Sequence, residues 1–244
     1  MKTVFYSFTT GHEWWIDHPE CLKEIIDETE ERYTPLSRES LAVRKGITFL
    51  KCPAHTDFLK NIFVLRAPID LNIEILINKD GDSKIWCDNI TQEIFSKIID
   101  VRYLEDSEKG ISPYPTVGID FLSTFTCKES LMVQLLPPFL HYNEFTEKTT
   151  LIPGEFDISK WTRPVELVFE FKNKQDKIHI KQGDAIAYFK FNTTEIVKLE
   201  QANRAPWDEM ILCNAIRESN KRRPLKERYE SLAEERAKRC PYER

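Results

Sequence analysis

Alternation of apolar and polar side chains constrains this chain more than any other feature of its sequence. The stretches "VELVFEF" (residues 165–171) and "KIHIKQGDAIAYFKF" (residues 177–191) carry an apolar side chain at nearly every second position. A period of two places those side chains on one face of a β-strand. Gly183 and Asp184 interrupt the second stretch, because glycine and aspartate both favour turns. The pattern predicts three strands that pair in sequence order as an antiparallel meander.

Similar strand texture recurs along most of the chain. Residues 41–77 and 116–138 contain apolar runs that end at Pro, Asn or Asp, and "NKDGDS" at residues 78–83 predicts a hairpin. The stretch at residues 89–106 fits a helix or a strand equally well. The sequence therefore predicts one mainly β domain over residues 1–203, built as an antiparallel β-sandwich, arranged as a jelly roll, with peripheral helices.

The C-terminal part has a different pattern. From Pro206 onward, apolar residues at helical spacing combine with many charges, and Pro224 divides the segment into two helices because proline is tolerated only in a first helical turn. We expect a helical appendage over residues 204–244. Its basic side chains, Arg222 and Arg223 among them, suit nucleic-acid phosphates or an acidic protein, and they equally suit a solvated helix pair.

Composition narrows the cellular setting. The chain has 244 residues, 41% of them apolar, which is enough for a substantial core. Its net charge of −5 argues against nucleic-acid binding over the whole surface. No run approaches the ~18–20 apolar residues that span a bilayer, and the first residues do not form a signal peptide. Six cysteines without a C-x-x-C pair indicate reduced thiols. We expect a cytoplasmic protein without membrane contact.

A His-x-Asp pattern at His55 and Asp57 is the candidate metal site. Non-haem iron oxygenases bind Fe(II) through two histidines and one carboxylate, which leaves positions open for 2-oxoglutarate and oxygen. In this interpretation His179, or alternatively His141, is the distal histidine, and Lys190 binds the 2-oxoglutarate carboxylate. The competing interpretation places His55 on the surface and Asp57 at a turn in a loop, because five histidines and forty acids often produce this spacing by chance.

The stretch "GDAIAYFKF" at residues 183–191 resembles the Gly-Asp-x-Ile-Ala step of trimeric dUTPases and dCTP deaminases. That resemblance implies nucleotide processing on a sandwich-like fold. The chain has neither a matching uracil-pocket hairpin nor a glycine-rich C-terminal arm, and the same step occurs where a hairpin re-enters a sheet. A dUTPase-like enzyme is therefore the second enzymatic alternative, after the oxygenase.

Two segments carry aromatic side chains suited to protein contact. Trp14 and Trp15 adjoin one another between polar residues, although one member of such a pair commonly packs into a core. The loop "LLPPFLHYNEF" contains Pro138, Phe139 and Tyr142, and such a loop covers an open end of a sandwich or forms an oligomer contact. Binding requires only shape and apolar area, so it demands less of a sequence than catalysis does.

Three segments in a fixed order carry a wider resemblance. "VGIDFLSTFTCKESLMVQLLPPFLH", "LIPGEFDISKWTRPVELVFEF" and "IHIKQGDAIAYFKF" are similar to an uncharacterised family of proteins from tailed phages of marine bacteria, of cyanophage type, with distant bacterial relatives. The family has no assigned activity, so the resemblance implies a β-rich fold and a phage-related origin without catalytic residues. The leading expectation is a phage-type β-sandwich protein of the host cytoplasm that binds or assembles with protein, including copies of itself.

Overall fold

The structure is a computed structural model of the whole chain. It describes residues 1–8, 33–36, 52–77, 83–90, 95, 98–102, 116–120, 123–127, 129–160, 165–173, 177–201 and 227. The contact residues predicted at Trp14, Trp15, Arg222 and Arg223, and nearly all of the segment at 204–244 that is predicted to be helical, lie outside these ranges. Within them the chain is mainly β, as predicted, and no helix there is long and apolar enough to cross a membrane.

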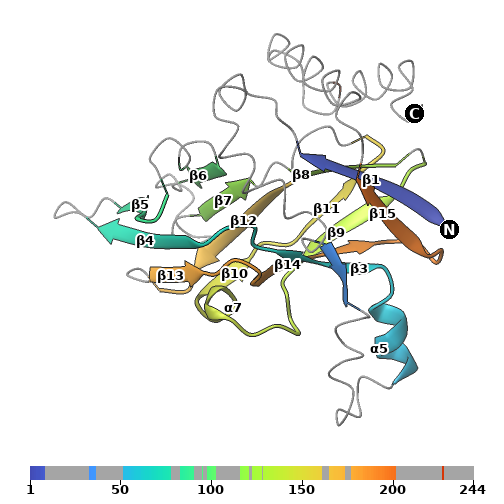
Figure 1. The fold of residues 1–244 in the computed structure, drawn as a ribbon, viewed down its shortest axis with the longest axis horizontal. Coiled ribbons are helices and arrows are strands. Elements are labelled where there is room, and N and C mark those ends of the chain that lie inside the picture. The colour runs from blue at the N-terminus through green and yellow to red at the C-terminus, as the bar shows by residue number, and fades with distance from the viewer. Residues whose placement is uncertain are drawn as a thin grey trace.

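The described strands form four sheets, none of which closes into a barrel (Figure 1). The largest is antiparallel throughout, with the order β11 (Gly154–Asp157), β9 (Met132–Leu136), β14 (Ala185–Phe191), β3 (Ile62–Arg66) and β2 (Tyr33–Pro35). A second antiparallel sheet has the order β10 (Thr149–Leu151), β12 (Glu166–Phe171), β7 (Thr116–Asp120) and β6 (Ile99–Arg102).

Two smaller sheets complete the described fold. One has the order β13 (Lys177–Ile180), β4 (Leu71–Ile77) and β5 (Ser83–Cys87), in which β4 and β5 form the hairpin that the sequence predicts. The other has the order β15 (Val197–Gln201), β1 (Lys2–Phe8) and β8 (Ser123–Thr126), and its β1–β15 pair is parallel. All four sheets contribute side chains to one apolar core, so the sheets are arranged in a sandwich-like manner.

The meander predicted for residues 165–191 is wrong. The three strands form where the alternation places them, but β12 pairs with β7 and β10, β13 pairs with β4, and β14 pairs with β3 and β9. Alternation determines which face of a strand is apolar, whereas the choice of neighbouring strand depends on packing between distant segments. Consecutive strands can therefore belong to three different sheets.

Strand β14 is buried on both of its faces. Phe189 and Phe191 point into the main core, whereas Ala185 and Tyr188 belong to a second, smaller core together with Leu36, Leu59, Ile62 and Val64. A register shift between Ala185 and Ala187 adjusts which residues face each core. The second core lies on the outer face of the five-stranded sheet, so that face requires a cover of its own.

Two short helices were not expected from the sequence. The segment around His55, expected to be a loop, forms α5 (Pro53–Phe58), with Pro53 in the first turn where a missing N–H does no harm. The long loop expected after β9 contains α7 (Glu144–Lys148), which begins with a capping box between Asn143 and Thr146.

The side chain of Asn61 joins three segments of the fold. Its amide nitrogen donates to the carbonyl oxygens of Thr193 (3.0 Å) and Glu195 (2.7 Å), and its amide oxygen accepts from the backbone N–H of Val197 (3.0 Å). Asn61 has φ 58°, a left-handed conformation that asparagine tolerates better than most residues. The turn before β3 thereby fixes the connection between β14 and β15.

We predict that Asn61→Ala lowers the free energy of unfolding by about 2–3 kcal/mol, because three hydrogen bonds are lost at a left-handed position. Asn192→Ala, which removes one exposed hydrogen bond to Glu155, should change it by less than about 0.5 kcal/mol. Urea unfolding followed by circular dichroism measures both. Equal effects of the two substitutions would contradict the proposed role of Asn61.

Candidate interaction surface

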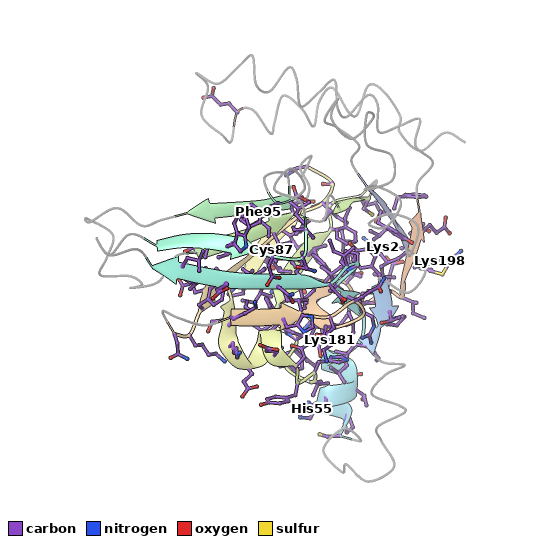
Figure 2. The ribbon with its side chains drawn as sticks, turned by 60° about the vertical axis from the view of Figure 1, so that its left-hand side comes forward. Lys2, His55, Cys87, Phe95, Lys181 and Lys198 are labelled. Carbon is purple, nitrogen blue, oxygen red and sulfur yellow. The ribbon has the colours of Figure 1, made fainter. Side chains whose placement is uncertain are left out.

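The predicted metal ligands are not brought together. His55 and Asp57 are exposed on α5, where Asp57 pairs with Lys60 at 2.7 Å, and His55 lies at the lower edge of Figure 2. His179 lies on β13 opposite Asn72, and Figure 1 places β13 and α5 toward opposite ends of the long axis. Among the described residues, no three His, Cys, Asp or Glu side chains are grouped so that they could hold a metal ion.

Hydrogen bonds to the end of β3 and within the turn itself hold the turn between β13 and β14 in place. Gly183 has φ 85°, its carbonyl oxygen accepts from the Arg66 guanidinium (2.7 Å), and its N–H donates to the carbonyl oxygen of Ala67 (2.9 Å). The Asp184 carboxylate accepts from the N–H of Lys181 (3.0 Å). The Gly-Asp step therefore fastens the turn to the end of β3, which accounts for these residues without a nucleotide.

Exposed apolar side chains gather on α5 and on the segment after β9. Phe58 is 42% exposed, Phe139 50%, Leu140 38% and Tyr142 80%. The rings of Phe58 and Phe139 are 6.0 Å apart although the residues come from segments far apart in sequence. These four side chains are called the aromatic surface below. Of the residues predicted in this loop, Phe139 and Tyr142 are exposed, whereas Pro138 is buried.

The aromatic surface is held from beneath by Tyr188. This side chain is fully buried in the second core, and its hydroxyl oxygen accepts from the N–H of Leu140 at 3.1 Å. The same hydroxyl lies 2.6 Å from His141 Nδ1, and the Phe139 ring meets the Tyr188 ring edge to face at 5.0 Å. The loop is therefore fixed by both hydrogen bonds and ring packing, so its exposed side chains have a defined position.

A hollow of about 340 Å³ adjoins the aromatic surface, between the loop, α7 and β10. Phe139, His141 and Tyr142 line one part of it, and Lys172 lines another. The Lys172 ammonium donates to the carbonyl oxygens of Thr146 (3.1 Å) and Glu147 (2.9 Å) at the end of α7. The walls of the hollow are thus tied to β12.

Ionisable side chains near the hollow form hydrogen bonds with one another that shift their pKa values. A hydrogen bond to the Glu147 carboxylate, and the negative charge of that group, raise the pKa of Tyr142. A hydrogen bond from Lys148 at 2.8 Å lowers the pKa of Glu144, against a smaller effect of burial. Lys148 also donates to the carbonyl oxygen of Lys177 (2.7 Å), so α7 is fixed to β13.

Sequence reasoning missed Phe58 and the second role of Lys190. The Lys190 ammonium lies 3.8 Å from the centre of the Phe58 ring. Pro53 followed by five residues without glycine was a usable signal for the helix that presents Phe58. Lys190 is the only charged residue of β14, and a single charge in an otherwise apolar strand was the other available signal.

No protein-family model matches the chain, and no curated protein matches its sequence. The geometry itself offers a rigid, exposed aromatic area beside an open hollow. Such an arrangement suits contact with another molecule through apolar area and shape.

We predict that Tyr188→Phe lowers the free energy of unfolding by about 1–2 kcal/mol, because the partly buried N–H of Leu140 loses its acceptor while the ring packing is kept. Amide hydrogen exchange at Leu140 should become faster. The matched control is Tyr142→Phe, which removes only an exposed hydrogen bond and should leave both quantities close to wild type. Unchanged exchange at Leu140 in Tyr188→Phe would contradict the anchoring role.

We also predict that Gly183→Ala costs about 1–2 kcal/mol of stability, because a Cβ is disfavoured at positive φ. Gly154→Ala is the matched control: an added methyl group meets no atom within 4 Å at either glycine, and only Gly183 has a positive φ. Thermal unfolding of both variants isolates the backbone effect. A Gly183→Ala variant as stable as Gly154→Ala would show that the turn relaxes.

Proposed function

We propose that this protein acts by binding another protein, without catalysis, and that the aromatic surface is its contact region. The observation that carries the proposal is the pairing of Phe58 with Phe139: two half-exposed rings from different segments meet above the buried Tyr188. Grouped exposed apolar side chains mark interaction sites on otherwise polar surfaces. Aromatic residues also contribute a large share of interface energy.

Rigidity supports the same proposal. The loop that carries Phe139 and Tyr142 is fastened by the Tyr188 hydroxyl and by the capping box of α7. A contact surface that is ordered before binding loses less conformational entropy on association. The oxygenase alternative requires a metal-binding group, and the described residues do not form one.

We further propose that the sheets form a jelly roll, that residues 204–244 form a helical appendage, and that the protein is of phage type and works in the host cytoplasm. Antiparallel pairs around one shared core are compatible with the first point. Charged helical spacing supports the second, and the sequence resemblance described above supports the third. We place this binding within assembly, either with a partner protein or with copies of this chain.

The test places a photoreactive phenylalanine analogue at position 142 and, as a control, at position 86. Trp86 is also an exposed aromatic residue, but it lies on β5 in another sheet. We expect position 142 alone to give one defined cross-linked species in cells that express the protein, and we expect Phe139→Ala to reduce its yield by about tenfold. Equal cross-linking from both positions would contradict the proposal.

A further inference from the structure

Lys190 occupies an unusual place in β14. The strand's other six residues are buried, and Lys190 is half-buried on the same face as Tyr188. Its register partners are Ile62 on β3 and Gln134 on β9, so its side chain emerges between two neighbouring strands. Lys190 is therefore carried by an internal strand of the sheet. Pairing on both edges of this strand fixes the position of the Lys190 backbone.

The ammonium group of Lys190 borders the aromatic surface. It lies 3.8 Å from the centre of the Phe58 ring, and Phe58 in turn contacts Phe139. A cation over an aromatic face gains a modest electrostatic stabilisation. Phe58 thus contacts both a charged group and an apolar ring.

No described carboxylate forms an ion pair with Lys190. Asp57 on the neighbouring helix pairs with Lys60 at 2.7 Å. Glu155, farther along the same sheet, accepts from the amides of Gln134 (3.1 Å) and Asn192 (2.9 Å). Partial burial lowers the pKa of Lys190, which means that the protein's own environment disfavours the charged form. A partner carboxylate would reverse that effect.

We propose that the aromatic surface recognises a segment of a partner protein in which an aspartate or glutamate carboxylate adjoins an aromatic or aliphatic side chain. Lys190 Nζ binds the carboxylate, while Phe58 and Phe139 contact the apolar side chain. This assignment rests on the proposed function and adds the chemical class of the partner to it. Charge complementarity selects this occupant, because no described carboxylate pairs with the partly buried cation and an apolar segment alone would supply none.

The charge of the whole molecule favours a protein over a nucleic acid as the source of the anion. Single-stranded nucleic acid also combines stacking groups with negative charge, but it requires a basic groove that follows the backbone. The net charge of this chain is −5, and the nearby Lys60 is already paired with Asp57. One cation beside a pair of aromatic rings matches one carboxylate beside one apolar side chain.

The test uses short synthetic peptides with blocked ends, each containing a glutamate next to a phenylalanine, tyrosine, tryptophan or leucine. Every peptide has a twin in which glutamine replaces the glutamate. Fluorescence anisotropy with the full chain should give about fivefold tighter binding of the glutamate peptide than of its twin at low salt, and a smaller ratio at high salt. Because the comparison is made first on the wild-type protein, it does not depend on the folding of a variant.

Variants then assign the effect to Lys190. Lys190→Met keeps the aliphatic stem and should abolish the difference between the twins. Lys198→Met, on β15 at another edge of the molecule (Figure 2), should leave it unchanged. Phe139→Ala should weaken both twins alike. An equal affinity of the twins for the wild type, or a difference that persists in Lys190→Met, would overturn the inference.

The remaining outcomes separate this inference from the proposed function. Twins that bind equally, and that both require Phe139, would remove the role of Lys190 while the binding function stands. No binding of any peptide would overturn the assigned partner chemistry. If an oligothymidylate binds more tightly than every peptide, the partner would be assigned as a nucleic acid and not a protein. If the wild type self-associates in sedimentation and Lys190→Met does not, the partner would be assigned as a second copy of this chain.

Discussion

The burial of β14 on both faces is the constraint on which the rest of the described structure depends. A strand with two apolar faces must pair on both edges and must be covered above and below, because unpaired backbone groups and exposed rings are both costly. β3 and β9 provide the pairing, and the main core covers one face. Among the described residues, the other face carries a small second core, whose outer cover comes from the end of α5 and the loop after β9.

The composition of this cover explains why exposed aromatic side chains occur at this place. Tyr188 is large and polar at its tip, so burying it requires both a hydrogen-bond partner and a neighbouring ring. The loop supplies the N–H of Leu140 and the ring of Phe139. One face of Phe139 is then used in packing and the rest remains exposed, and α5 places Phe58 beside it. The proposed contact region therefore consists of side chains that also cover the buried Tyr188.

The sequence predicts the strands better than it predicts their neighbours. Period-two alternation places β12, β13 and β14 correctly and identifies the turn at Gly183, because these depend on local side-chain direction and backbone conformation. It cannot assign the three strands to three sheets, since pairing depends on distant partners. The same limit applies to the candidate site: exposure of Phe139 and Tyr142 followed from their loop, whereas the contact between Phe58 and Lys190 joins residues 132 positions apart.

The role assigned to Lys190 differs between the sequence and the structure. In the oxygenase interpretation Lys190 binds the carboxylate of 2-oxoglutarate; in the structure its ammonium group lies 3.8 Å from the centre of the Phe58 ring. Its affinity for a carboxylate is retained in both interpretations, because an ammonium group beside a partly apolar surface lacks full hydration. The two interpretations differ in the residues that they place around Lys190. With Phe58 beside it and Phe139 next to that ring, the same cation is suited to the partner recognition proposed above.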